Sequence, residues 1–377
     1  MSEANSNEKK IEQNREVEDF QGNSELEATP IVKIKKRTGK RTKKQIGEET
    51  GQEAIEEKTS EKNNEVTSEQ SDIPFWRTEK SKGRKKKPIG VNGIDMGERG
   101  VYDKRNKLND LTGREWTFFL NSVLVQAYPP TIREGVGFNL RKIHPSPKPP
   151  QLMKEIISFF TKRDQWILDP FVGVGGSLLG GSLCDSPRHG VGIDLNAQYL
   201  EAYKQVCQTD NLPTELTIHG DAEETLRNGH PYLNRQFQLI ITDPPYADMM
   251  TKKKTGQKQK FYGKTDPTPY TNDENDLGNL GYNEFLDKFR DIMELAVGRL
   301  EVGKYAVVFC KDFQPKPGAP NLLHADIINS LSTIPGLVYR GVKIWYDQAN
   351  DLFPFGYPYA YVMHQMHQYI LIFRKEA

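Results

Sequence analysis

Four short apolar segments of this chain each lead into an aspartate, and this repetition restricts the folds that the chain can adopt. The four aspartates are Asp169, Asp194, Asp221 and Asp243. Short apolar runs that alternate with helical patterns predict the buried strands of a mostly parallel sheet. The carboxyl ends of the strands in such an open α/β sheet face the ligand crevice, so we expect the four acids to meet at one edge.

The segment Asp243-Pro244-Pro245-Tyr246 follows the predicted strand 237–242 and carries the most specific chemistry. An exocyclic amine on a nucleobase is a poor nucleophile, because its lone pair is delocalised into the ring. The Asp243 carboxylate and the Pro244 carbonyl can both accept hydrogen bonds from that amine, and the fixed φ of proline holds the carbonyl in one orientation. Tyr246 can stack on a base that has been flipped out of its duplex. The alternative is a turn that closes a strand, since Asp and Pro are common turn residues.

A second segment, from Trp166 to Ser177, ends a strand in Asp169 and continues in glycines. Gly173 and Gly175 allow a tight turn and a close approach of the backbone to a ligand. The lysine of a phosphate loop is missing, and a pyrophosphate would be repelled by Asp169. An acid at this point suits a cationic ligand, and the sulfonium and ammonium groups of S-adenosylmethionine are cations.

The other two acids extend this cradle. Asp194 ends the predicted strand 190–193 at the interval of about twenty residues where an acid meets ribose hydroxyls in nucleotide-binding α/β folds. Asp221 can bind the adenine edge of the same cofactor. Each acid alone is more often a helix N-cap than a ligand. Four of them in the required order favour the binding site.

Taken in this order, the residues resemble the amino-group DNA methyltransferases, which methylate adenine N6 or cytosine N4 with S-adenosylmethionine. The segment from His144 to Met153 resembles the family's helix-leading motif over the methionine end of the cofactor. The segment from Asp169 to Gly175 resembles its DPF-x-G-x-G motif. The resemblance implies a catalytic tetrapeptide of Asp243, Pro244, Pro245 and Tyr246. It implies the cofactor-binding residues His144, Lys148, Asp169, Pro170, Phe171, Gly173, Gly175, Asp194, Leu195, Asp221 and Ala222.

The resemblance also implies a fold, a Rossmann-like class I methyltransferase. This α/β fold is a three-layer sandwich around a mostly parallel seven-stranded sheet with a closing antiparallel strand. Val174 stands where the family usually has serine, and we expect the loop backbone to tolerate it. The cofactor motifs precede the catalytic motif, so the circularly permuted order is excluded. The segment Asn109 to Trp116 is similar to one that precedes the catalytic domain in many DNA methylases, and we assign it no chemistry.

Periodicity predicts the elements that complete the sheet. We expect helices over 197–207, 282–300 and 324–332, and strands over 304–310, 337–345 and 369–373. The aromatic and proline-rich segment 352–361 lies before the last strand. Segments of this composition more often serve packing than recognition, although this one could line the rim of a base pocket.

The chain of 377 residues allows one large domain and an appendage. Residues 1–73 contain a single aromatic, Phe20, and are rich in charged and polar residues, so we expect a disordered tail. Residues 74–140 form an N-terminal extension that could contact DNA, and residues 141–377 form the methyltransferase domain. A basic loop insertion at about 247–281 should overhang the active site.

A net charge of +1 conceals two dense basic runs, 33–44 and 80–87, on either side of an acidic stretch. Basic arms add salt-sensitive affinity for nucleic acid that does not depend on base sequence, whereas the alternative is a solvated tail or an import signal. Lysines from Lys252 to Lys264, interleaved with aromatics, favour a loop that contacts DNA. The expected partner is therefore DNA, and the sequence does not reveal a partner subunit or an oligomeric state.

Cysteine usage argues against other chemistries. Cys184, Cys207 and Cys310 lack the paired spacing of a zinc site or a disulfide framework, so we expect no metal. None of them follows a proline, as a nucleophile for cytosine C5 methylation would. No apolar window is long enough for a membrane span, so we expect an intracellular, cytoplasmic protein associated with DNA.

The predicted function is methylation of a flipped-out adenine at N6 in DNA. Cytosine N4 is the closest rival, but that group more often has serine in place of Asp243. An RNA base methyltransferase shares the chemistry and the tetrapeptide. A catalytically silent DNA-binding subunit would not need the intact acids. The recognition sequence and any companion restriction nuclease cannot be deduced from the sequence.

Overall fold

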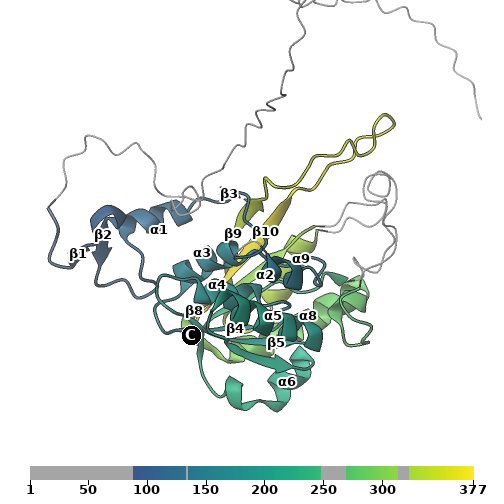
Figure 1. Cartoon of the computed structure of the whole chain (residues 1–377), viewed down its shortest axis with the longest axis horizontal. Helices are drawn as coiled ribbons and strands as arrows, with labels where there is room; N and C mark the ends of the chain where they lie inside the picture. The colour runs from purple at the N-terminus through teal and green to yellow at the C-terminus, as the bar shows by residue number, and fades with distance from the viewer. Residues whose placement is uncertain (1–87, 133–134, 248–268, 313–321) are drawn as a thin grey trace, which may run out of the picture. The chain divides into compact units, whose positions relative to one another are not determined.

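The computed structural model describes residues 88–377 apart from 133–134, 248–268 and 313–321 (Figure 1). The predicted tail, both basic runs and the lysines from Lys252 to Lys264 lie outside the described residues.

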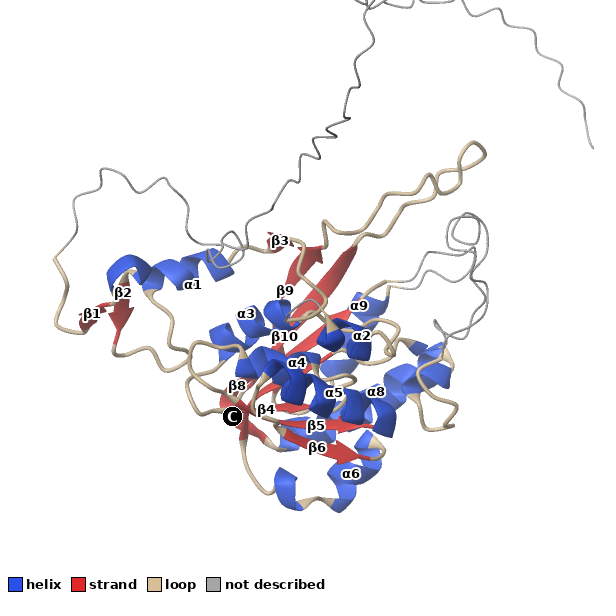
Figure 2. Ribbon diagram, in the orientation of Figure 1, coloured by secondary structure: helices blue, strands red, loops and turns tan. Residues whose placement is uncertain are grey.

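The central element is a mixed sheet in which the strands follow the order β3-β9-β10-β8-β7-β4-β5-β6 (Figure 2). Its strands are β3 (Val123–Val125), β4 (Trp166–Asp169), β5 (His189–Asp194), β6 (Leu216–His219), β7 (Phe237–Thr242), β8 (Leu300–Cys310), β9 (Leu337–Tyr346) and β10 (His367–Lys375). Neighbouring strands are parallel except where β10 runs antiparallel to both β8 and β9. This is the mostly parallel sheet with a closing antiparallel strand that the sequence predicts. The sheet has eight strands rather than seven, because β3, from the segment before residue 140, pairs with β9.

Helices cover both faces of the sheet, which confirms the three-layer sandwich. One face carries α3 (Pro150–Phe160), α4 (Gly176–Ser182) and α5 (Ala197–Asp210). The shorter helices α1 (Gly113–Phe119) and α2 (Val136–Arg141) pack against α3 and α5, respectively. The opposite face carries α6 (Ala222–Asn228), α8 (Tyr282–Gly298) and α9 (Leu323–Leu331).

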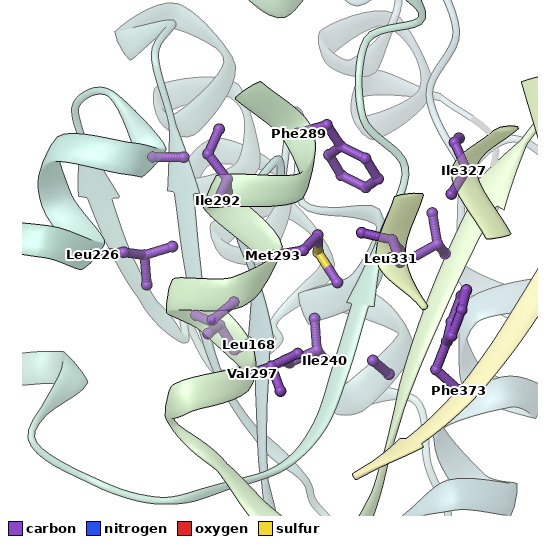
Figure 3. Close-up of a cluster of buried hydrophobic side chains, with 14 of the residues drawn as sticks. Leu168, Leu226, Ile240, Phe289, Ile292, Met293, Val297, Ile327, Leu331 and Phe373 are labelled. Carbon is purple, nitrogen blue, oxygen red and sulfur yellow. The ribbon is translucent and has the colours of Figure 1, made fainter. Parts of the chain in front are cut away.

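The core follows the two-residue period of the strands. On β7, Leu239 and Ile241 face the layer of α3 to α5, whereas Ile240 faces the layer of α8. Ile240 meets Met293 and Val297 of α8 in the cluster drawn in Figure 3. All of these side chains are essentially inaccessible to solvent. Burial on both faces explains why the parallel strands read as continuous apolar runs.

The N-terminal extension is attached to the sheet domain by specific polar contacts. The buried Asn109 donates from Nδ2 to the carbonyl of Phe159, at 2.6 Å, and Asp110 Oδ2 accepts from Arg188 Nη2 at 3.1 Å. Thr112 and Glu115 form a capping box at the start of α1. The segment Asn109 to Trp116 therefore has a structural role here. Before it lies a small hairpin of β1 (Gly93–Asp95) and β2 (Val101–Asp103), with the 3₁₀ turn η3 (Gly97–Arg99) between them.

The remaining predicted elements are confirmed, with bounds that shift by a few residues. The helices expected over 197–207, 282–300 and 324–332 are α5, α8 and α9, and the last three predicted strands are β8, β9 and β10. Two further 3₁₀ turns are η4 (Pro231–Leu233) and η6 (Leu277–Asn279). Among the described residues no helix has the length and apolar character that a membrane crossing requires.

Candidate active site

The four predicted acids lie along the carboxyl edge of the sheet, at the ends of β4, β5, β6 and β7. A larger and a smaller cavity adjoin there. His144, Phe171 and Asp243 line both cavities, so the two form one continuous site.

Most of the predicted site residues line this site. The larger cavity is bordered by His144, Pro170, Phe171, Asp194, Leu195, Asp221, Ala222, Asp243 and Pro245. The smaller is bordered by His144, Lys148, Asp169, Phe171, Gly173 and Asp243. Pro244, Tyr246 and Gly175 are not among the lining residues of either cavity.

The glycine loop between β4 and α4 is shaped by two glycines with positive φ. A Cβ atom on Gly173 (φ 52°) would lie 3.0 Å from His144 Nε2, within the cavity wall. A Cβ atom on Gly175 (φ 76°) would lie 2.1 Å from Tyr203 Cδ2, so only glycine fits there. Gly175 therefore lets the loop pack against Tyr203 of α5, whereas Gly173 leaves space beside His144 in the cavity. Val174, which stands where the family usually has serine, is buried against Tyr199.

Asp169 lies beneath this loop and is almost wholly buried. Its Oδ1 accepts hydrogen bonds from Thr242 Oγ1 (2.8 Å) and the Phe171 amide (3.1 Å), and its Oδ2 accepts from Ser177 Oγ (2.5 Å). Burial raises the pKa of Asp169 to about 7, although these hydrogen bonds oppose the shift. Asp169, at the end of β4, therefore connects β7 and α4 through hydrogen bonds and borders the smaller cavity.

Asp194 is held by backbone amides at the end of β5. Its Oδ2 accepts from the Gly173 amide (2.7 Å) and its Oδ1 from the Asn196 amide (2.8 Å). Burial raises the pKa of Asp194 to about 6. Each carboxylate oxygen has a second lone-pair direction that can accept a ligand hydroxyl. Asp221 also lines the larger cavity while it caps α6 by accepting from the Glu224 amide at 2.8 Å, so here the cap and the site coincide.

Asp243 is held by side chains rather than by amides. Lys148 Nζ lies 2.7 Å from Asp243 Oδ2 and also donates to Gln368 Oε1 at 2.7 Å. Tyr246 donates its hydroxyl hydrogen to Asp243 Oδ1. The Tyr246 ring is buried in the core cluster of α8, and burial together with the adjacent Asp243 carboxylate raises the pKa of its hydroxyl well above the usual value. The expected stacking of Tyr246 on a base stays a prediction.

His144 forms an uncharged wall between the cavities. Burial lowers the pKa of His144 to about 3, and the charges of Arg141 and Lys148 lower it further. Its ring lies 4.8 Å from that of Tyr199 and 5.2 Å from that of Tyr270, measured between centroids. The neutral imidazole therefore belongs to an aromatic wall rather than to a proton relay.

A cover over the larger cavity comes from residues that the sequence reasoning did not assign. The carbonyl of Tyr270 accepts from Asn196 Nδ2 and from the Tyr199 hydroxyl, both at 3.2 Å. The buried Asp276 fixes this segment by accepting from the amide and hydroxyl of Thr271 at 2.9 and 2.8 Å. Both lie in the loop expected over 247–281. Its described end therefore borders the small-molecule cavity, and the predicted DNA contact of its lysines lies outside the described residues.

The site fits S-adenosylmethionine by its own chemistry. Carboxylates occur around both cavities, where they suit a sulfonium, an ammonium and ribose hydroxyls, and the missing Cβ of Gly173 leaves space beside His144. Asp169, Lys148 and Gly173 would surround the methionine end. Asp194, Asp221 and Ala222 would surround the adenosine end. Within the described residues, no cluster of His, Cys, Asp and Glu could hold a metal ion.

Comparisons with known proteins agree with this chemistry. A family model described as DNA methylase matches residues 27–205, a stretch that contains the glycine loop and Asp194 and ends before Asp243. The tRNA (guanine(10)-N(2))-methyltransferase of Dictyostelium discoideum is 31% identical over 151 residues, 38% of this chain and 28% of the relative. The tRNA (guanine(10)-N2)-dimethyltransferase of Pyrococcus abyssi is 30% identical over 128 residues, 32% of this chain and 37% of the relative.

The chain thus spans well under half the length of these two curated relatives. Among solved structures, TrmN from Thermus thermophilus aligns with a TM-score of 0.36 and 14% identity, over 60% of this chain and 48% of that one.

Proposed function

We propose that this chain is an N6/N4 amino-methyltransferase, the family whose model matches residues 27–205, and that it methylates the N6 amine of adenine in DNA. In this proposal the cofactor is S-adenosylmethionine, and the activity is methyl transfer to a base of nucleic acid.

The observation that carries the proposal is the position of Asp243. Its carboxylate borders both cavities, on the same sheet edge as the three acids of the cofactor site. An amine bound to Asp243 would therefore lie beside the methyl donor, and this proximity can contribute about 7 to 11 kcal/mol to lowering the barrier. S-adenosylmethionine supplies an electrophilic methyl group on its sulfonium.

The residues around Asp243 have distinct tasks in this proposal. Lys148 and Tyr246 each occupy one direction at the two carboxylate oxygens and fix the plane of the carboxylate. A free lone pair of Asp243, which borders both cavities, would accept one amine hydrogen. The carbonyl of Pro244, the next residue, would accept the other when a bound base reaches it, since Pro244 itself borders neither cavity. Both hydrogens of the amine are then held by acceptors. This favours rehybridisation of the nitrogen from its planar form, so that its lone pair is exposed to the methyl group.

A second candidate is methylation of a guanine N2 amine in RNA. The two curated relatives are named as tRNA guanine-N2 methyltransferases, and this observation favours an RNA substrate. An exocyclic amine on guanine presents the same two hydrogens to Asp243 and Pro244. The catalytic geometry therefore suits both substrates, and the intact tetrapeptide supports either one.

Nucleoside mass spectrometry separates these candidates. Purified full-length protein is incubated with labelled cofactor and either duplex DNA or transcribed tRNA, and the nucleosides are then digested and quantified. We expect labelled N6-methyladenine from DNA, and none with the Asp243→Ala variant. Labelled N2-methylguanine from tRNA alone would establish the second candidate, and N4-methylcytosine would correct the target base. Absence of label in every base would refute nucleobase methylation.

A further inference from the structure

The segment between β9 and β10, residues 347–366, carries three tyrosines that are almost completely exposed. Tyr357, Tyr359 and Tyr361 expose 75%, 93% and 86% of their surface, and Leu352 and Met363 nearby are also exposed. The sequence favours packing over recognition for this segment. The structure contradicts packing for the three tyrosines, because they are exposed to solvent. Figure 1 shows the segment in yellow, extending beyond the ends of β9 and β10. We refer to residues 347–366 as the tyrosine hairpin.

Aromatic packing within the tyrosine hairpin supports its exposed tip. The rings of Phe353, Phe355 and His364 lie 4.8 to 5.9 Å apart between centroids, and the Phe353 amide donates to His364 Nδ1 across the hairpin at 3.3 Å. At the tip, the amides of Tyr359 and Ala360 donate to the carbonyl of Gly356 at 2.7 and 2.8 Å. The rings of Phe353, Phe355 and His364 thus pack against one another within the hairpin, whereas the three tyrosines are exposed to solvent.

The hairpin arises from the catalytic edge of the sheet. Since β9 runs parallel to β8 and β7, its last residue, Tyr346, lies at the same edge as Asp243, and β10 begins there at His367. The next residue, Gln368, accepts from Lys148, which in turn binds Asp243. Further aromatic rings lie where the hairpin joins β10. The Tyr369 ring stacks on the His324 ring at 4.1 Å and contacts the His367 ring at 4.9 Å, measured between centroids.

The tip of the tyrosine hairpin presents several aromatic faces to solvent. Tyr357, Tyr359 and Tyr361 border a shallow hollow together with Pro358. Residues 347–366 contain Asp347 and Asp351 but no lysine or arginine, so the segment offers no attraction to phosphate groups. The contribution that it can make to binding a nucleic acid is aromatic, because the exposed tyrosine faces can stack on nucleobases whatever their sequence.

We propose that the tyrosine hairpin binds unstacked bases of the nucleic acid next to the target nucleotide. This inference rests on the proposed function, because it assumes that the target base leaves its stack to reach Asp243. The neighbours of a flipped base lose a stacking partner, and a tyrosine ring that takes its place stabilises the opened duplex. The hairpin therefore contributes affinity for the opened substrate that does not depend on sequence or on salt.

The test compares the triple variant Tyr357→Ala/Tyr359→Ala/Tyr361→Ala with wild-type protein in binding to two fluorescent duplexes. One duplex has an unpaired or abasic target position, and the other is fully paired. We expect the triple variant to lose at least about tenfold in affinity for the opened duplex, and much less for the paired one. The slope of log K against log salt should remain unchanged, because no charge is removed. The triple Tyr→Phe variant should bind like wild type, since it keeps the rings.

Tyr232→Ala provides the matched control, because Tyr232 is also exposed but lies in η4, which precedes β7 at the opposite edge of the sheet. Equal affinity of wild-type and triple variant for the opened duplex would overturn the inference and leave the hairpin to a protein partner. A changed salt slope would overturn the stacking role as well. Methylation by wild-type protein is measured in parallel. Its complete absence counts against the proposed function, whereas methylation with unchanged binding counts against the hairpin alone.

Discussion

Asp194 and Asp243 are both carboxylates at the same edge of one sheet, but the protein holds them in different ways. Asp194 accepts from two backbone amides that belong to the glycine loop and to the start of α5. Asp243 is bound by two side chains, those of Lys148 and Tyr246. The backbone itself places the two amides, whereas the packing of buried side chains places Lys148 and Tyr246. The difference separates a proposed cofactor site held by the backbone from a proposed amine site held by side chains, each of which a single substitution can remove.

The largest effect should come from removing the carboxylate at the proposed amine site. Asp243→Ala should lower kcat by about a thousandfold or more, because the acceptor for the amine hydrogens is lost. Titration calorimetry should show a cofactor Kd within about threefold of wild type, since the amide-held acids remain. Asp287→Ala, an exposed position on α8, serves as control. Undiminished methyl transfer by Asp243→Ala would refute the assignment of this residue.

The backbone of the proposed cofactor site can be disturbed at Gly175. Gly175→Ala should destabilise the fold by about 3 kcal/mol, because the new methyl group strikes the Tyr203 ring and the φ of 76° suits only glycine. Urea unfolding followed by circular dichroism measures this loss. Gly298→Ala at the end of α8 is the matched control, since its Cβ would meet no atom within 4 Å. Equal stability of the two variants would show that the loop yields easily.

Lys148 distinguishes the two sites most directly, because the family resemblance gives it to the cofactor and the geometry pairs it with Asp243. Lys148→Met should lower kcat by about a hundredfold, as expected when one group that orients a reacting side chain is removed. The cofactor Kd should change by less than about threefold. The control is Lys154→Met on α3, whose pairing with Asp185 is solvent-exposed and contributes little. A large rise in Kd with kcat preserved would return Lys148 to the cofactor.

Asp194→Asn should show the opposite pattern. We expect the cofactor Kd to rise about ten- to a hundredfold, because a charged acceptor for ligand hydroxyls is replaced by a neutral one. At saturating cofactor, kcat should stay within a few-fold of wild type. Loss of kcat without a change in Kd would contradict the division of the edge into two sites.

The smallest effect concerns pH. Because burial raises the pKa of Asp194 to about 6, its carboxylate is protonated as pH falls from 7 to 5, and we expect cofactor affinity to fall by about tenfold. The Asp194→Asn variant should keep only the part of this fall that comes from Asp169, whose pKa of about 7 places its own protonation in the same range. In the protein without cofactor the sign is reversed. The folded pKa lies above the unfolded value of about 3.9, so the contribution of Asp194 to stability is present at pH 4 and is lost as pH rises through 6.

The cofactor side was predictable because its contacts are local or follow the strand pattern. Asp194 bonds to Asn196 two residues later and to the glycine loop of the preceding βα unit. The pairing of Lys148 with Asp243, and of both with Gln368, joins segments that lie far apart in sequence. No periodicity in the chain encodes such a contact. The cover formed by Tyr270 was missed for the same reason, since it depends on where a loop returns.

The tyrosine hairpin shows a different limit. Aromatic residues are usually read as core because burial of their surface stabilises the fold. In this segment the phenylalanines follow that rule in part, whereas Tyr357, Tyr359 and Tyr361 do not. Sequence composition does not distinguish the two groups. The structure does, because the three tyrosines expose 75 to 93% of their surface at a tip beyond the ends of β9 and β10 (Figure 1).

The pairing of β3 with β9 has a practical consequence for dissecting the protein. A chain shortened to begin at residue 141 would retain every predicted catalytic and cofactor residue but would lose β3. The free edge of β9 would then offer unpaired amides and carbonyls to another molecule, which is a common cause of aggregation. Lys343 would also lose the carbonyls of Phe119 and Asn121 as hydrogen-bond acceptors, although its side chain is buried. Inactivity of such a shortened chain would therefore reflect an uncovered sheet edge and not a missing catalytic group.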